Sequence, residues 1–322
     1  MPKMMIKSSL YVATASLLLM FAALLFIDWK FPQQSDGQLV FAETYSAIGK
    51  LDRIKLVTPF DTITLEQKDG FWTVKELNNY FADTGTVNRL LSDINNSTFY
   101  SRQNYSAADA EADLLSEKNG VLVQTYAGDK LLDSVIVGKA VADDRYHFVR
   151  RAKKQEIWLA DGIFKLPMEK TSWILQPIAE FPVDSVESVD FEGIKLSRDN
   201  VHQMFGASSQ QENAVKSLLS LTSVIMAEDV IKEESFVADN YPQRRLIKLT
   251  SFEGLIAEYA LFSDANEDWL KINLSTAPLA KSRVSDYIRE HRIFYDGWYF
   301  KIPAVQGEML LSASISSTQA QK

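Results

Sequence analysis

Leu10–Ile27 (LYVATASLLLMFAALLFI) is a run of 18 residues without a charge or a Pro. As a helix it would cover about 27 Å at about 1.5 Å per residue, close to the hydrocarbon thickness of a bilayer. Asp28, Trp29 and Lys30 follow at once, and Trp is enriched where a membrane meets water. The pattern predicts an uncleaved transmembrane anchor. The alternative is a cleaved signal peptide, whose apolar region is normally about 7–15 residues long.

Basic residues are distributed unevenly around this run. Lys3 and Lys7 precede it and only Lys30 follows it closely, a bias that favours a cytoplasmic N-terminus. The anchor would then hold the main body on the periplasmic side of the inner membrane.

Two later stretches have the spacing of amphipathic helices. VNRLLSDI begins at Val87 and VKSLLSLT begins at Val215, and both contain V-x-x-L-L-S. Apolar residues at positions i, i+3 and i+4 line one face of a helix. We expect Asp83 to cap the first helix, and Ser209 with Glu212 to form a capping box at the second.

Alternating apolar and polar positions, typical of strands, surround each helix. LDRIKLV and DTITLEQ precede the first helix, and VDSVESVDF and GIKLSRD precede the second. Two predicted hairpins follow, VLVQTYAGDKLLDSVIVG and LIKLTSFEGLIAEYALFS, each with a Gly at its turn. Both series also end alike, in DGIFKLP at 161–167 and DGWYFKIP at 296–303. The sequence therefore predicts a duplicated unit.

The predicted fold class is α+β, with a single N-terminal transmembrane helix followed by two similar α+β units built on antiparallel sheets. A chain of 322 residues is long enough for about two domains, and without Cys it forms no disulfide or Cys-based zinc site. The expected boundaries are a cytoplasmic N-terminus and anchor at 1–30, a linker at 31–48, a first repeat at 49–180, a second repeat at 181–311 and a disordered tail at 312–322.

Charge narrows the choice of partner. Beyond Lys30 the chain has 31 basic and 41 acidic residues, because three of its 34 Lys and Arg and one of its 42 Asp and Glu come earlier. The resulting net charge near −10 disfavours nucleic acid and close contact of the body with anionic lipid.

Acidic residues around 63–84 admit two interpretations. In the first, Lys68-Asp69-Gly70 is a hairpin turn and Glu66 is a solvated residue of the scaffold. In the second, Glu66 converges with Asp143 and Asp144 in the cleft of an envelope hydrolase, where paired carboxylates lie within about 5–10 Å.

Metal and cofactor sites are not expected. The three histidines, His147, His202 and His291, have no His partner at i+3 or i+4, so no helix presents a metal-binding face with two His ligands. Alternation in the strand YHFVR predicts that His147 is at the surface or half buried. The chain contains no P-loop, G-x-G-x-x-G or G-x-S-x-G motif.

Several motifs in order resemble a known family. Ile63–Val74 reads I-x-L-x-x-K-D-G-x-W-x-V, Ala82–Leu91 reads A-D-T-x-x-V-N-x-L-L, Tyr146–Arg150 reads Y-x-F-V-R and 298–303 reads W-Y-F-K-I-P. Together with the N-terminal apolar run they resemble bacterial envelope proteins with domain of unknown function 4340, over most of 49–310. The resemblance implies no established activity. Some members resemble auxiliary parts of ABC transport systems, which implies an extracytoplasmic accessory role.

Two clusters are candidate binding surfaces. A basic run would contact headgroups or an acidic partner, or else be a solvated loop. An aromatic cluster near the end of the chain would be a partner surface, or else part of the core. The basic patch consists of Arg145, Arg150, Arg151, Lys153 and Lys154, and the aromatic cluster of Phe294, Tyr295, Trp298, Tyr299 and Phe300.

The predicted function is a membrane-anchored extracytoplasmic binding or scaffold protein of the bacterial envelope, without catalytic activity. An accessory component of an ABC-type transport system is the specific role that the resemblance implies. The expected partners are the inner membrane, through Leu10–Ile27, and another envelope or transporter protein, with no nucleic acid. The alternatives are a lipid- or glycan-binding module with an apolar groove between the repeats, and the hydrolase.

Overall fold

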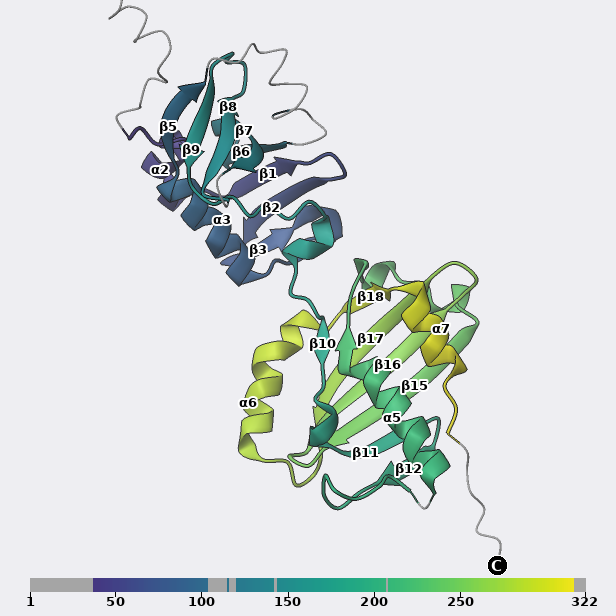
Figure 1. Cartoon of the computed structure of the whole chain (residues 1–322). Coiled ribbons are helices and arrows are strands. Elements are labelled where there is room, and N and C mark those ends of the chain that lie inside the picture. Colours follow the sequence, from purple (N-terminus) through teal and green to yellow (C-terminus); the bar gives the residue numbers. More distant parts are fainter. Residues whose placement is uncertain (1–36, 104–114, 116–119, 142–143, 207, 316–322) are drawn as a thin grey trace, which may run out of the picture. The chain divides into compact units, whose positions relative to one another are not determined.

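The structure is a computed structural model that describes residues 37–103, 115, 120–141, 144–206 and 208–315 (Figure 1). The predicted anchor lies outside these residues and stays a prediction. None of the helices that the structure does describe is both long and apolar enough to cross a membrane.

The chain divides into two compact units. The first contains the described residues up to Leu65 together with Thr84–Met168. The second contains Glu66–Asp83 together with the chain from Glu169 onward. The excursion Glu66–Asp83, which lies early in the sequence, therefore belongs to the second unit.

The first sheet is antiparallel, with the strand order β4-β3-β2-β1-β6-β7-β8-β9-β5. Helix α2 packs beside α3 and against β7. The bounds are α2 (Ala42–Ser46), β1 (Arg53–Val57), β2 (Thr62–Lys68), β3 (Phe71–Val74), β4 (Tyr80–Phe81), α3 (Thr84–Asn96), β5 (Thr98–Gln103), β6 (Val121–Ala127), β7 (Lys130–Val141), β8 (Tyr146–Arg151) and β9 (Ile157–Asp161).

The second sheet is also antiparallel, with the order β12-β11-β15-β16-β17-β18-β14, and β10 pairs separately with β13. The bounds are β10 (Ala179–Glu180), β11 (Val186–Phe191), β12 (Ile194–Ser197), α5 (Ser209–Ser223), β13 (Val224–Ile225), β14 (Asp229–Lys232), β15 (Gln243–Ser251), β16 (Leu255–Ser263), β17 (Asp268–Thr276), α6 (Ser282–His291), β18 (Trp298–Ile302) and α7 (Ala304–Ser312). Short 3₁₀ helices are η1 (Ile48–Lys50), η2 (Lys75–Leu77), η3 (Lys170–Trp173), η4 (Val183–Ser185), η5 (Glu233–Ser235), η6 (Ala238–Asn240) and η7 (Arg292–Phe294).

The two sheets share one strand order. Seven strands of the first sheet, β2-β1-β6-β7-β8-β9-β5, correspond one to one with β12-β11-β15-β16-β17-β18-β14. In both series one helix, α3 or α5, precedes the strand that ends the sheet, β5 or β14. A duplicated unit would produce this correspondence. One connection differs between the two units: residues 152–156 join β8 to β9, whereas 277–297, including α6, join β17 to β18.

Alternating burial explains how each sheet covers its core. Ile54 and Leu56 on β1 are fully buried, and Leu56 lies opposite the buried Val123 of β6. In the second sheet, Ile247 and Tyr259 lie opposite each other, and both are buried. Burying one such side chain stabilises the fold by about 1.5–3 kcal/mol relative to leaving it in water.

Both predicted helices are confirmed, and so is the side of each that faces the core. Helix α3 buries Val87, Leu90 and Ile94, whereas Leu91 of the same predicted face is half buried. Helix α5 buries its predicted stripe as well: Val215, Leu218, Leu219 and Thr222. The period of 3.6 residues, read from the sequence, was sufficient for this result.

The predicted hairpin turn at Lys68-Asp69-Gly70 is also confirmed. Asp69 and Gly70 have φ angles of 50° and 85°, as a two-residue turn of this hand requires. The α+β class and the antiparallel pairing of the strands are confirmed with it.

Two local predictions are wrong. The N-cap of α5 is Ser208, which accepts a hydrogen bond from Gln211 N at 3.2 Å, because either of two adjacent serines could satisfy the pattern. The matched segments at the ends of the copies also differ. Trp298–Ile302 forms β18, whereas 162–167 contains no strand, and β9 occupies the corresponding place in its sheet.

Candidate functional site

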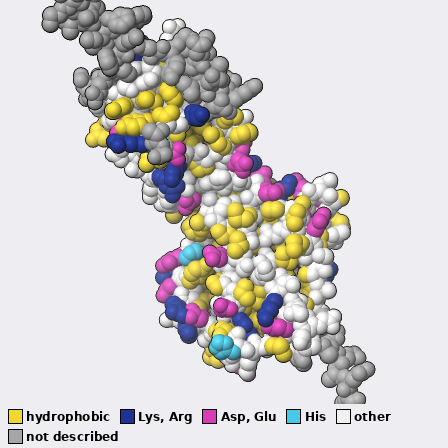
Figure 2. All heavy atoms as spheres, viewed as in Figure 1, with side chains coloured by type: hydrophobic (Ala, Val, Ile, Leu, Met, Phe, Trp, Pro, Cys, Tyr) yellow, Lys and Arg dark blue, Asp and Glu magenta, His cyan; other side chains and the backbone are white. Residues whose placement is uncertain are grey.

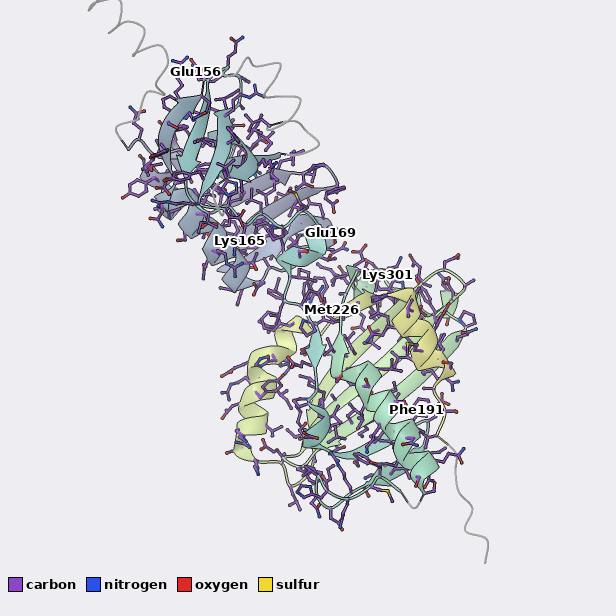
Figure 3. All side chains as sticks on the ribbon, in the orientation of Figure 1. Glu156, Lys165, Glu169, Phe191, Met226 and Lys301 are labelled. Carbon is purple, nitrogen blue, oxygen red and sulfur yellow. The ribbon has the colours of Figure 1, made fainter. Side chains whose placement is uncertain are left out.

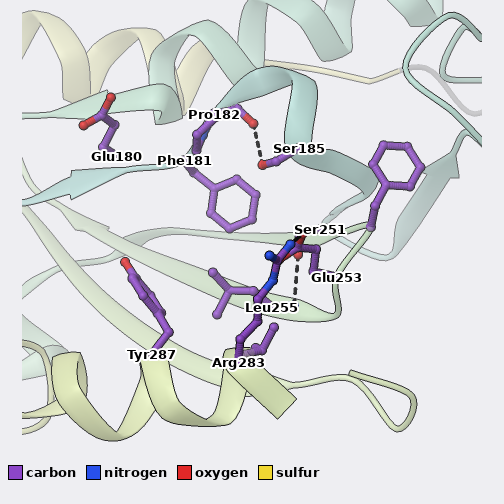
Figure 4. Close-up of a pocket in the computed structure, with 11 residues that line it drawn as sticks. Glu180, Phe181, Pro182, Ser185, Ser251, Glu253, Leu255, Arg283 and Tyr287 are labelled. Carbon is purple, nitrogen blue, oxygen red and sulfur yellow. Dashed lines mark hydrogen bonds and ion pairs between the residues drawn. The ribbon is translucent and has the colours of Figure 1, made fainter. Parts of the chain in front are cut away.

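A cavity of about 740 Å³ lies in the second unit, beside α6, the β15–β16 turn and the segment that leads into β11 (Figure 4). Pockets for small molecules commonly measure about 300–1,000 Å³ and have mostly apolar walls. The lining residues are Glu180, Phe181, Pro182, Ser185, Ser251, Phe252, Glu253, Leu255, Arg283, Val284 and Tyr287. The wall is thus mainly aromatic and aliphatic.

Helix α6 forms one side of the cavity, and few of its side chains are buried. Val284 is its only fully buried residue, and Tyr287 is 38% exposed although its ring lines the cavity. Figure 2 shows positively and negatively charged side chains along the edge of the second unit that is formed by α6. Arg289 and His291 lie in its last turn, where positive charge complements the helix dipole. The helix thus contributes Arg283, Val284 and Tyr287 to the lining of the cavity.

The β15–β16 turn meets the start of α6 closely. Gly254 has a φ of 88°, and a Cβ at that position would lie 2.6 Å from Ala280 Cα, so no other residue fits without a shift. Lys281 N donates to Glu253 O at 2.9 Å, and Arg283 Nε donates to Glu253 Oε2 at 2.6 Å. The turn and the helix therefore meet at an ion pair on the rim of the cavity.

The opposite wall is held by hydrogen bonds to the backbone. Ser185 Oγ donates to Pro182 O at 2.6 Å, and Ser251 Oγ accepts from Leu255 N at 3.0 Å, as the dashed lines in Figure 4 mark. Phe252 N donates to Ser185 O at 3.0 Å. Both hydroxyl groups therefore shape the wall, and the apolar rings and chains are what a ligand would meet.

The charged groups of the cavity lie at its rim. The side chain of Arg283 is 66% exposed and that of Glu253 is 36% exposed, and Glu180 is exposed as well. Burial raises the pKa of Tyr287 above its ordinary value of 10.0, so its phenol is neutral near pH 7. The cavity can therefore bind an apolar chain inside and a polar group at its mouth.

The structure places most of the aromatic cluster in the core of the second unit. Trp298, Tyr299 and Phe300 are buried, and Phe294 and Tyr295 are half buried. Tyr80 meets Trp298 and Phe300 edge-on, with ring centroids 5.0 and 5.6 Å apart. Of the two interpretations of this cluster, the core is the one that its burial supports. The cluster attaches the segment Glu66–Asp83 to the second sheet.

The candidate basic patch is divided along β8. Arg151, Lys153 and Lys154 gather with exposed side chains at the β8–β9 turn, next to the labelled Glu156 in Figure 3. Arg145 directly precedes the other end of the strand and pairs with Asp161 at 3.3 Å. The remaining residue, Arg150, is half buried, and its Nη1 donates to Lys154 O at 3.3 Å.

The acidic residues of the hydrolase hypothesis that the structure describes, Asp144 and Glu66, belong to different units. Asp143 lies outside the described residues, and Asp144 is an exposed turn residue with a φ of 65° in the first unit. Glu66 is in the second unit. Burial alone would raise its pKa, but Lys68 and Lys75, at 3.2 and 3.4 Å, lower it below the ordinary value.

The prediction that His147 is at the surface or half buried is wrong, because the residue is 6% exposed. Its Nε2 accepts a hydrogen bond from Phe164 N at 3.2 Å, and its Nδ1 lies 3.3 Å from Gly138 O. These contacts fit a neutral imidazole with the proton on Nδ1. Within the described part of the chain, no group of three or more His, Asp or Glu side chains is arranged to hold a metal ion.

The cavity was missed at the sequence level. Its walls come from residues far apart in the chain, and neither the aromatic cluster nor the basic run contributes to it. One signal was available in SRVSDYIREH, where Val284, Tyr287 and Ile288 have the i, i+3, i+4 spacing of an amphipathic helix.

Comparison with known proteins gives one match. The family model described as "Domain of unknown function (DUF4340)" matches residues 72–245, just over half of the 322 residues. No curated protein and no solved structure matches the chain.

Proposed function

The chain belongs to the DUF4340 family, as its motifs predicted, and from this premise and the cavity we propose that it is a membrane-anchored, non-catalytic binding protein whose second unit binds a lipid-like amphiphile. An amphiphile here means a molecule with one acyl-length apolar chain and a polar head. The location in the bacterial envelope and the accessory role beside a transporter belong to the same proposal, and they rest on the predicted anchor and the family resemblance.

The observation that carries the proposal is the apolar cavity beside α6. The wall of the cavity includes the apolar side chains of Phe181, Phe252, Leu255 and Val284. Burying an apolar ligand against such a wall gains about 25 cal/mol of binding free energy for each Å² of ligand surface removed from water. A glycan would leave its hydroxyl groups unpaired against these side chains, at a cost for each group. An acyl chain therefore fits the wall better than a sugar does.

The rim supports an amphiphile over a wholly apolar ligand. Arg283 and Glu253 face the mouth as an exposed pair, and an exposed pair of this kind contributes only about 0–1 kcal/mol to stability. A ligand headgroup can therefore displace one partner of the pair at little cost. The cavity lies wholly within the second unit, whereas the sequence-based hypothesis put an apolar groove between the repeats.

Photo-crosslinking tests this proposal in cells that express the full chain. A fatty acid with a diazirine in its chain is supplied, the cells are irradiated, and modified peptides are identified by mass spectrometry. We expect modification to concentrate in the peptides that contain 181–185, 251–255 and 283–287. In the variant Leu255→Trp, whose indole occupies part of the cavity, the yield at these peptides should fall at least about tenfold, as loss of roughly 1.4 kcal/mol of binding would produce.

The matched control is Leu246→Trp, on the neighbouring strand β15. Leu246 is 47% exposed and does not line the cavity, so its yield should equal that of the wild type. Modification spread evenly over the surface, or an equal yield in all three proteins, would contradict the proposal.

A further inference from the structure

The β8–β9 turn of the first unit holds cations on an ordered frame. Lys154 N donates to Arg151 O at 3.0 Å, which closes the turn. Lys153 has a φ of 65°, in the left-handed region that lysine seldom occupies. The ordered backbone of this turn therefore presents three exposed cationic side chains, those of Arg151, Lys153 and Lys154.

A fourth cation joins them from another strand. Arg102 on β5 is exposed and lies opposite Trp158 of β9. Arg102, Arg151 and Lys154 line a hollow of about 240 Å³ whose lining includes one carboxylate, that of Glu156. We call Arg102, Arg151, Lys153 and Lys154 the basic surface.

Apolar side chains adjoin the basic surface. On the other side of the turn, a hollow of about 520 Å³ shares Arg151, Lys153 and Lys154 and adds Leu122 and Leu131, the latter 44% exposed. Cations mixed with exposed apolar and aromatic groups are typical of surfaces that rest on the headgroup region of a bilayer.

The described chain begins at this surface. Gln38 lines the smaller hollow, Phe99 N donates to Gln38 O at 2.8 Å, and Arg151 Nη2 donates to Leu39 O at 3.3 Å. Ten residues lie between Gln38 and Ile27, the last residue of the predicted anchor. Fully extended, this stretch of chain spans at most about 40 Å, so the predicted anchor would keep the basic surface within that distance of the membrane.

We propose that the basic surface docks on the anionic lipid headgroups of the membrane that holds the anchor. The net charge of the body, near −10, does not prevent this contact, because charges farther than about 8 Å are largely screened at physiological salt. The inference rests on the predicted anchor and not on the cavity, so either proposal can fail while the other holds.

The test uses the full chain in lipid nanodiscs. Because the chain has no Cys, Gln155→Cys in the same exposed turn takes a single fluorescent label. Its quenching by headgroup spin-labelled lipid is measured in neutral phosphatidylcholine discs and in discs with about 30% anionic phosphatidylglycerol, where each basic residue gains attraction. We expect stronger quenching in the anionic discs. Adding Lys153→Glu and Lys154→Glu should remove at least about half of that difference.

The matched control carries the same change in charge elsewhere, with Lys139→Glu and Lys195→Glu, both exposed and outside the basic surface. It should keep the full difference between the two kinds of disc. Equal quenching in both discs, or an equal loss in the control, overturns the proposal and leaves the basic surface to an acidic protein partner. A chain that does not enter the discs overturns it as well.

Discussion

Arg198 illustrates how one buried side chain supports the wall of the cavity. Its Nε and Nη2 donate to Val186 O and Val183 O, both at 2.9 Å, and its guanidinium lies 5.8 Å from the ring centre of the cavity residue Phe252. The residue is 8% exposed. A lysine has no planar fork with which to serve both carbonyls.

We therefore predict that Arg198→Lys lowers the free energy of unfolding by about 1–3 kcal/mol, because a buried carbonyl loses its donor. Urea titration of the full chain in micelles measures the change. The control is Arg289→Lys, at a side chain that is 70% exposed in an ion pair with Asp286, and its effect should stay within about 0.5 kcal/mol. Equal effects of the two substitutions would contradict the role assigned to Arg198.

His147 should make stability depend on pH in a defined direction. Burial lowers its pKa below the ordinary 6.5, although Gly138 and Asp144 act in the opposite direction. Below about pH 6.5 the unfolded chain therefore binds a proton at this histidine more readily than the folded chain does. The free energy of unfolding consequently decreases as the pH falls below about 6.5. We predict that His147→Asn has a smaller loss of unfolding free energy than the wild type between pH 7 and pH 5, as followed by urea titration at each pH.

The comparison must be made as a difference between proteins, because Asp93 acts in the opposite sense. Burial raises the pKa of Asp93 to about 6, so its contribution falls as the pH rises through that value. The exposed His202 provides the control, and His202→Asn should keep the wild-type profile. A profile of His147→Asn that overlays the wild type would refute the assignment.

At the scale of elements, the structure differs from the sequence-based prediction at the N-terminus of α5. Ser208 caps the helix, whereas the pattern pointed to Ser209. We predict that Ser208→Ala costs about 1 kcal/mol of unfolding free energy, the usual value of an N-cap. Ser209→Ala is the matched neighbour and should cost less than about 0.5 kcal/mol. Thermal unfolding that ranks the two variants the other way would restore the cap predicted from the sequence.

Elements could be predicted where their residues interact locally. The stripe Val87, Leu90 and Ile94 follows a period of 3.6, and the Asp69-Gly70 turn follows from the positive φ that few residues tolerate. The failures occur where distant chain segments decide. His147 is buried by its contact with Phe164, and Arg102 joins the basic surface only because β5 pairs with β9. No spacing within the sequence encodes these contacts.

At the scale of the whole molecule, the shared strand order is the one that the predicted duplication would produce. The connection between corresponding strands is the basic β8–β9 turn in one copy and the segment with α6 in the other. The two surfaces to which we assign binding thus occupy the same place in the topology. In a duplicated chain, such a connection can vary without disturbing the paired strands, because loops tolerate insertions better than sheets do.

The central claim is that the second unit holds an amphiphile. The measurement that tests it most directly is a quantitative analysis, by mass spectrometry, of the lipids extracted from the full chain purified from cells, compared with Leu255→Trp and Leu246→Trp. Lipids carried along by the membrane anchor should be the same in all three preparations. We predict one additional species, stoichiometric with the wild type and with Leu246→Trp, and lost from Leu255→Trp. Identical lipid content in the three proteins would contradict the claim.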